Sequence, residues 1–224
     1  MALADNWKRA QSGDPFWDEQ SAGLHAAHVA PLNELIVRLG DAKGGVRLPL
    51  AAPWHGGIHA PALIVLNDAG EPRDETTFMC IRNPDRAADR QRHLMTEFGI
   101  HPTDFCQWNG YPWPRSDPKR DLTPEQSAEG GRALLEVMGL MTDLEMLLLL
   151  GKKAQDAADA VLPQIHSTFP ELHIVRSLHP LGAKRTVDRQ EQKRVWAGIA
   201  GRLREGRAGG LAVPESAGSA RTTQ

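Results

Sequence analysis

The sequence contains little cysteine. Its 224 residues include only two, Cys80 and Cys106, each within an apolar segment. Two thiols are too few for a disulfide framework, for a zinc site of four cysteines or for an iron–sulfur cluster bound by four cysteines. We therefore expect both to be small buried core residues, and we expect the protein to use no metal ion and no other cofactor.

Long apolar runs and a net positive charge are also missing. No stretch reaches about 18 apolar residues, and the first residues lack the pattern of a signal peptide, so we expect a cytoplasmic protein without a membrane partner. The formal net charge of −2 argues mildly against nucleic acid, because Lys and Arg drive binding to phosphates. The basic stretch from Lys184 to Arg194, KRTVDRQEQKR, is either a local basic face or a solvated helix surface.

Four short, continuously apolar runs predict strands that are buried on both faces. They are residues 61–68, 104–109, 145–151 and 171–177. Helical stretches follow Asp85, Thr123 and Gly151, and a further helix is expected from Thr186 to Arg204. Strands that alternate with helices imply an α/β fold, here a three-layer sandwich with a central four-stranded, mainly parallel sheet.

The flanks of this region differ from it in composition. Residues 25–40 carry apolar side chains at spacings of three and four, which predicts an amphipathic helix closed by Gly40 within a helical cover, residues 1–44. Residues 45–205 are interpreted as the α/β domain. Residues 206–224 are rich in Gly, Ala and Ser and are expected to form a mobile tail.

Polar side chains stand at three of the strand ends. Parallel sheets bind ligands beyond the carboxyl ends of their strands, and Asn67 and Asp68 end the first strand, Asn109 ends the second and His179 follows the fourth. Each has a structural alternative, since Asx residues cap turns, Asn before Gly is a frequent turn pair, and His before Pro is often a loop residue. The amide of Asn109 offers both donors and an acceptor, the complement of the uracil edge.

In this order and spacing, the strand-end motifs NDAG, QWNGYPWP and HPLGAKR resemble those of the uracil-DNA glycosylase superfamily, over roughly residues 45 to 204. The resemblance implies that Asp68 activates or orients the attacking water, or that Asn67 does so, as in a branch whose activating residue lies one place earlier. It also implies that Phe78 stacks on the flipped base and that Asn109 reads its edge. The cysteine count excludes the branches that carry an iron–sulfur cluster.

The chemistry implied by the resemblance suits these residue types. Cleavage of an N-glycosidic bond develops positive charge on the sugar and negative charge on the departing base, so a carboxylate and a hydrogen-bond donor are needed. Asp68 and His179 fit these roles, with His179 either neutral or charged. Leu181, flanked by Lys184 and Arg185, is interpreted as a wedge between base steps beside phosphate-binding cations; the alternative is a solvated helix start with Leu181 folded back on the core.

These observations predict a monomeric, monofunctional DNA glycosylase, a hydrolase of base-excision repair whose partner is DNA that contains uracil or a related deaminated base. The alternative is a non-catalytic binder of nucleic acid or nucleobases on the same fold, suggested by Ala69, Leu181 and the mild acidity. A third possibility is an N-ribosyl hydrolase of free nucleosides. A metal site at His55 and His59 is not expected, because two intervening glycines disfavour the helix that would align them.

Overall fold

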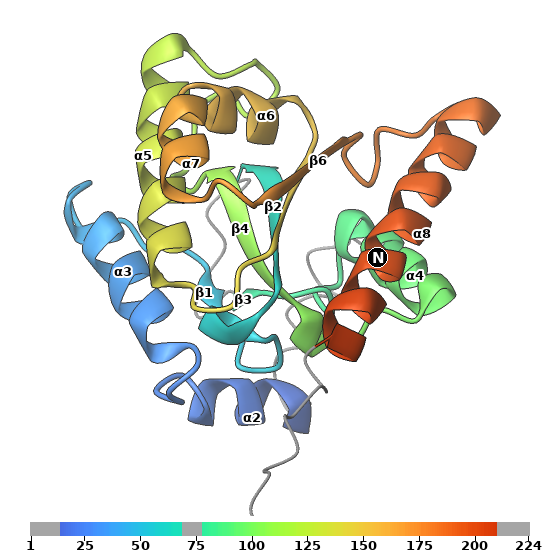
Figure 1. Ribbon diagram of the computed structural model, residues 1–224. Helices are drawn as coiled ribbons and strands as arrows, with labels where there is room; N and C mark the ends of the chain where they lie inside the picture. Colours follow the sequence, from blue (N-terminus) through green and yellow to red (C-terminus); the bar gives the residue numbers. More distant parts are fainter. Residues whose placement is uncertain (1–13, 69–77, 210–224) are drawn as a thin grey trace, which may run out of the picture.

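The computed structural model describes residues 14–68 and 78–209. Its centre is a four-stranded sheet with the order β4-β2-β5-β6, in which every pair is parallel (Figure 1). The strands are β2 (Ala62–Asp68), β4 (Phe105–Tyr111), β5 (Met146–Leu150) and β6 (His173–Ser177). The four predicted strands are therefore confirmed, and none of their ends is displaced by more than two residues.

Helices cover both faces of this sheet, which makes the fold a three-layer α/β sandwich (Figure 1). On one face lie α3 (Ala30–Asp41), α5 (Pro124–Leu140), α6 (Lys152–Asp159) and α7 (Leu162–Thr168). On the other face lie α4 (Arg86–Phe98) and α8 (Thr186–Gly209). Outside the sheet, α2 (Pro15–Ala22) packs near a short parallel pair, β1 (Leu50–Ala51) and β3 (Phe78–Met79), which the sequence did not predict.

Successive residues of the central strands contribute to different layers. Leu63 and Val65 of β2 belong to the hydrophobic cluster that includes α3 and α5, whereas Ala62 and Ile64 belong to the cluster that includes α4 and α8. Neighbouring side chains of a strand point to opposite faces. Since both faces are covered by helices, the strands need apolar residues at every position, and they appear in the sequence as continuous apolar runs.

Close contact between α5, α6 and β4 depends on glycine. A Cβ atom on Gly130 of α5 would lie 2.0 Å from the carbonyl oxygen of Gly110 in β4. A Cβ atom on Gly110 would lie 2.8 Å from Cα of Ala154 in α6. The absence of side chains at these two positions therefore lets both helices approach the strand more closely than any other residue would allow.

Two expected helix boundaries differ from the observed ones. The helix expected over residues 25–40 begins only at Ala30, and Gly40 lies inside it rather than closing it. A Cβ atom on Gly40 would lie 2.2 Å from the carbonyl oxygen of Val46, so this glycine permits a close chain crossing. The last helix continues to Gly209, four residues into the expected tail, and residues 210–224 lie outside the described part of the chain.

Several expectations about the core are met. Cys80 and Cys106 are buried free thiols. Phe16 and Trp17 of α2 are also buried. Over residues 14–68 and 78–209, no helix has both the length and the apolar character of a membrane span.

Candidate active site

Two of the predicted site residues, Asn67 and His179, meet around Gly151 at the carboxyl edge of the sheet, and Asp68 follows Asn67 in the chain. This glycine precedes α6 with a φ of +106°, a conformation that favours glycine. A Cβ atom at this position would lie 2.5 Å from Oδ1 of Asn67 and 3.0 Å from Cβ of His179. The turn after β5 thus brings together the ends of β2 and β6, which are not neighbours in the sheet.

Asn67 is held by the start of α6. The backbone N–H of Lys153 donates to Oδ1 of Asn67 at 3.2 Å. Within the described ranges, the amide nitrogen of Asn67 has no hydrogen-bond partner. The Asn67 side chain is therefore fixed through its oxygen, and its donor group is available to a water molecule or a ligand.

Asp68, the last residue of β2, is bound by two cations. Its Oδ2 accepts from Nζ of Lys153 at 2.6 Å and from Nη1 of Arg115 at 3.2 Å. All three side chains are largely buried, with exposed fractions of 14% for Asp68, 9% for Lys153 and 6% for Arg115. The negative charge of Asp68 is thus compensated inside the protein. Among the described residues, its Oδ1 has no hydrogen-bond partner.

The same two cations attach the loop that follows β4. Lys153 donates to the carbonyl oxygen of Pro118 at 2.5 Å. The guanidinium group of Arg115 donates to the carbonyl oxygens of Arg120 and Asp121 at 2.9 and 2.8 Å. Residues 118–121 are therefore connected to the end of β2 through Asp68.

Sequence reasoning missed both Lys153 and Arg115. The sequence pattern places Lys153 in an ordinary helical stretch and indicates no role for Arg115. Both follow strands at the carboxyl edge of the sheet, the position at which ligands of such sheets bind. Applying that positional rule to every charged residue after a strand would have identified them.

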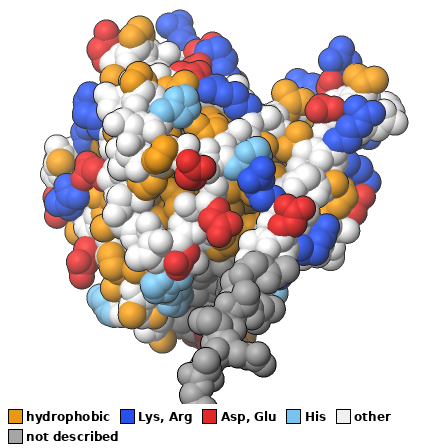
Figure 2. Space-filling model, viewed as in Figure 1, with side chains coloured by type: hydrophobic (Ala, Val, Ile, Leu, Met, Phe, Trp, Pro, Cys, Tyr) orange, Lys and Arg blue, Asp and Glu red, His pale blue; other side chains and the backbone are white. Residues whose placement is uncertain are grey.

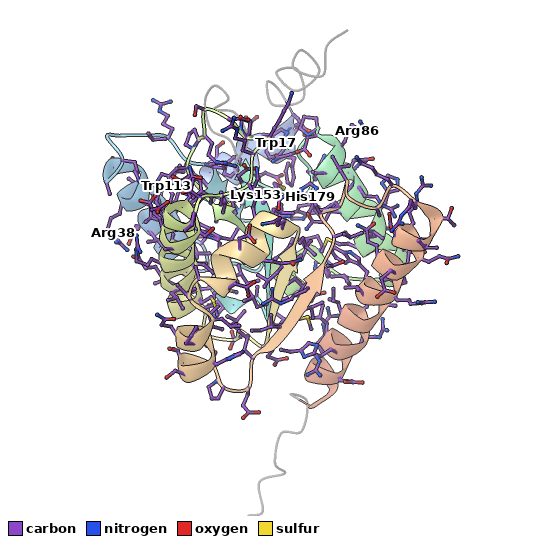
Figure 3. All side chains as sticks on the ribbon, turned by 90° about the horizontal axis from the view of Figure 1, so that it is seen from above. Trp17, Arg38, Arg86, Trp113, Lys153 and His179 are labelled. Atoms are coloured by element: carbon purple, nitrogen blue, oxygen red, sulfur yellow. The ribbon has the colours of Figure 1, made fainter. Side chains whose placement is uncertain are left out.

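His179 is half-buried beside this group, and Figure 3 shows it next to Lys153. Burial lowers the pKa of His179 below its ordinary value; the charges of Asp68 and Asp85 act in the opposite direction, and Lys153 lowers it further. The backbone N–H of Leu181 donates to Nδ1 at 3.3 Å, which leaves Nε2 to carry the proton of the neutral ring. Of the two states left open by the sequence, the structure favours the neutral imidazole, with Nε2–H as a donor.

Asn109 lies within β4 and not at its end, because the strand continues to Tyr111. Its Cα is paired with that of Leu66, one residue before Asn67, so it stands close to the candidate site in the sheet. Its side chain is buried, with 7% of the residue exposed, and makes no hydrogen bond to other described residues. The role of Asn109 in reading a base stays a prediction.

Phe78 is a core residue in this conformation. It is 2% exposed, and its ring is nearly parallel to that of Trp17, with 6.0 Å between the centroids. Asn83 donates to its carbonyl oxygen at 2.8 Å. Stacking of a base on Phe78 therefore requires an opening of this cluster, and the predicted stacking role remains untested.

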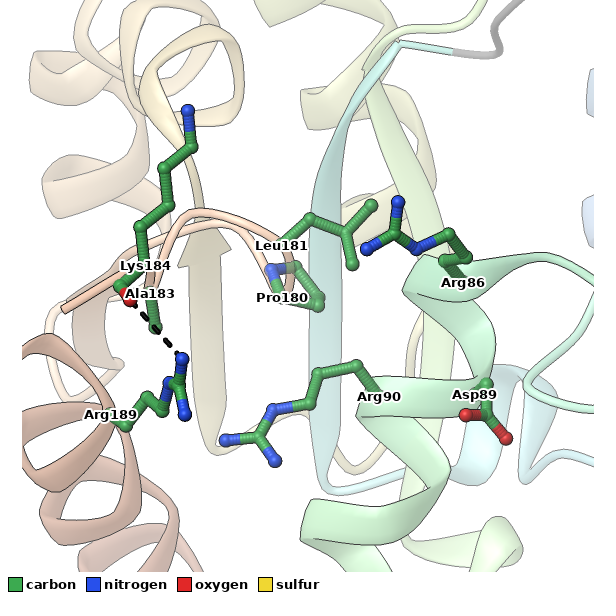
Figure 4. A pocket seen from close by; sticks show the side chains of 8 residues that line it. All are labelled: Arg86, Asp89, Arg90, Pro180, Leu181, Ala183, Lys184 and Arg189. Carbon is green, nitrogen blue, oxygen red and sulfur yellow. Dashed lines mark hydrogen bonds between the residues drawn. The ribbon is translucent and has the colours of Figure 1, made fainter. Parts of the chain in front are cut away.

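A cationic cleft of about 650 Å³ begins immediately after His179 (Figure 4). Its lining residues come from α4, from the loop after β6 and from α8: Arg86, Asp89, Arg90, Pro180, Leu181, Ala183, Lys184 and Arg189. Leu181 is 42% exposed, so it is not folded back on the core. Two of the three predicted DNA-binding residues, Leu181 and Lys184, line this cleft.

Arg185, the third predicted DNA-binding residue, is not part of the lining. Its guanidinium group binds the carboxylate of Asp188, with 2.7 Å between Nη2 and Oδ1. The ion pair joins the residue before α8 to the first turn of that helix on the protein surface, where such pairs contribute little to stability. The basic stretch of the sequence thus divides into cations that line the cleft and cations that neighbouring acids neutralise.

No protein-family model matches the chain, and no curated protein matches it either. The superfamily resemblance of the strand-end motifs is therefore a prediction, and the function has to be inferred from the site itself.

Proposed function

We propose that the protein is a DNA glycosylase that hydrolyses the N-glycosidic bond of uracil or of a related deaminated base. One observation carries the proposal: Asn67, Asp68 and His179 come together at the carboxyl edge of the sheet, and the cationic cleft starts at the next residue, Pro180. Side chains that can stabilise the charges formed in glycosidic cleavage thus lie next to a surface that can bind a polyanion such as DNA.

In the proposed reaction, the oxygen of a water molecule forms a bond to C1′ of the sugar, and the base departs with the electrons of the glycosidic bond. The proton released by the water goes to the departing base or to solvent. Nε2–H of His179 donates a hydrogen bond to the base as its negative charge develops, and neutral His179 needs no proton transfer for this. Asn67 orients the water through its amide nitrogen, and Oδ1 of Asp68, which the two cations on Oδ2 leave free, accepts a hydrogen bond from the same water.

The proposal is tested with duplex and single-stranded oligonucleotides that carry uracil, hypoxanthine or xanthine, followed by alkaline cleavage of abasic sites. We expect cleavage at uracil or another deaminated base, and a loss of at least about tenfold in single-turnover rate for Asp68→Asn, Asn67→Ala and His179→Gln. Asp117→Asn, on the exposed loop after β4, is the matched control and should leave the rate unchanged. Undiminished excision by all three site variants would remove this group of residues from the mechanism.

Two observations favour a second candidate, a non-catalytic protein that binds nucleic acid or nucleobases. Lys153 and Arg115 compensate the charge of Asp68, and Phe78 is packed in the core. Such a protein would bind the uracil-containing oligonucleotide and release no base. Activity on free nucleosides with none on oligonucleotides would instead indicate a small-molecule N-ribosyl hydrolase.

A further inference from the structure

The α4–α8 cleft, defined by its eight lining residues, has cations on both of its walls. Arg86 and Arg90 lie one helical turn apart on α4 and therefore on the same side of that helix. Lys184 and Arg189 stand opposite them, and Leu181 projects between the two walls (Figure 4). The single acid of the lining, Asp89, points away from Leu181 and is bound by Arg92 outside the cleft.

No cation of the lining is neutralised by a carboxylate of the described residues, and Arg90 binds only the neutral amide of Gln192. Arg86, Lys184 and Arg189 are exposed, and none of them forms an ion pair within residues 14–68 and 78–209. Basic residues nearby do form such pairs: Arg185 with Asp188, Lys193 with Glu97, and Arg194 with Glu191. Over α8, Lys and Arg are interspersed with Asp and Glu, as Figure 2 shows. Four cations without a carboxylate partner thus stand together in the cleft, although the whole chain is slightly acidic.

A buried side chain connects the walls of the cleft. Gln192 is 1% exposed, and its Nε2 faces the carbonyl oxygens of His179 and Pro180 at 3.5 and 3.4 Å. Its Oε1 accepts from Nε and Nη2 of Arg90 at 3.3 and 3.1 Å. One buried side chain therefore connects α4, α8 and the loop that carries His179. A preformed cleft loses little conformational entropy when it binds a ligand.

Apolar side chains accompany the cations. Of the four large hydrophobic residues exposed on the described surface, Leu178, Leu181 and Val187 lie within residues 178–187, and Leu181 lines the cleft. A small inorganic anion would gain nothing from contact with these apolar side chains. The sugars and bases of a nucleic acid, in contrast, can contact them between phosphates. We propose that the α4–α8 cleft binds the phosphodiester backbone of nucleic acid through Arg86, Lys184 and Arg189; that the polymer is DNA rests on the proposed function.

The test is the salt dependence of binding to an undamaged, fluorescently labelled DNA duplex. The triple variant Arg86→Gln, Lys184→Gln, Arg189→Gln should bind at least about tenfold more weakly at low salt, and its slope of log affinity against log salt should fall by about two to three units. Replacing Lys193, Arg194 and Arg204 of α8 by Gln changes the net charge equally outside the cleft, and should leave the slope nearly unchanged. Equal slopes for the two triple variants would overturn the proposal.

Further measurements test whether the variants are folded and whether the cleft binds anions other than nucleic acid. All three side chains are exposed, so the thermal unfolding temperature should not change, and Arg86→Lys with Arg189→Lys should keep the slope. Inorganic phosphate at equal ionic strength should not displace the duplex. Displacement by phosphate, or by polyglutamate as well as by DNA, would show a general anion surface and overturn the assignment to nucleic acid. The duplex contains no damaged base, so failure of excision with cleft-dependent binding would overturn only the proposed glycosylase activity.

Discussion

At the scale of single residues, Lys153 holds both candidate water-orienting side chains. Its backbone N–H binds Asn67, and its ammonium group binds Asp68. We expect Lys153→Met to lower the single-turnover excision rate at least about tenfold with little change in affinity for DNA, because both side chains lose a fixed partner. Its neighbour Lys152 is exposed and pairs with Asp156, so Lys152→Met is the control and should excise normally. Normal excision by Lys153→Met would show that the site needs no such anchor.

His179 provides a prediction about pH at the same scale. Because burial lowers its pKa, the ring should stay neutral down to a pH below the ordinary value of about 6.5. Excision that requires the neutral ring should therefore fall on acidification with a midpoint below this ordinary value. The negative charge of Asp68 raises the pKa of His179, so Asp68→Asn should lower it further. An NMR titration of the ring measures both values, and a pKa at or above the ordinary value would contradict the role of burial.

At the scale of elements, the strands could be predicted because burial on both faces demands an unbroken apolar run. The β2 segment therefore stands out locally in the sequence. The two-residue strands β1 and β3 could not be predicted, since their only signal is a pairing between Leu50 and Phe78, far apart in the chain. The candidate site likewise contains residues that the local sequence predicts and contacts that it does not. Asn67, Asp68 and His179 follow apolar runs, whereas the ion pair between Arg115 and Asp68 becomes visible only in three dimensions.

Helix α5 contains two glycines with opposite expected effects on stability. Gly130→Ala would put a Cβ atom 2.0 Å from the carbonyl oxygen of Gly110 and should lower the free energy of unfolding by about 1–3 kcal/mol. The control Gly139→Ala, near the end of the same helix, meets nothing within 4 Å and should raise that free energy by up to about 1 kcal/mol. Urea unfolding measures both, and equal effects of the two changes would refute the close packing of α5 on β4.

At the scale of the whole molecule, the net charge conceals local clusters of cations that could bind nucleic acid. The net charge of −2 argues against nucleic acid, yet the fold brings Arg86 of α4 to Lys184 and Arg189 at the start of α8. The basic stretch that contains Lys184 can be recognised in the sequence. The ion pair in which Asp188 neutralises Arg185 cannot be recognised there. Which charges remain unpaired depends on side-chain neighbours, and the order of residues alone does not determine them.

The change in folding stability at acidic pH should depend on His55. This residue is 3% exposed, its Nδ1 lies 3.3 Å from the carbonyl oxygen of Pro102, and its Nε2 is buried without a hydrogen-bond partner among the described residues. Burial lowers its pKa to about 4. As the pH falls from about 6.5 towards 4, the unfolded chain takes up a proton at this position and the folded protein does not, so the folded state loses stability, by up to about 3 kcal/mol at pH 4.

Urea unfolding at a series of pH values tests the assignment to His55. His55→Asn removes the titrating group, so the decline in unfolding free energy between pH 6.5 and 4 should become shallower, although the variant is less stable at neutral pH. His59→Asn changes an exposed histidine a few residues away and should keep the original slope. The carboxylates contribute equally to the slopes of all three proteins, so the difference between them isolates His55. If the slope of His55→Asn equals that of the unmodified protein, His55 does not control acid stability, and the decline must come from other titrating groups.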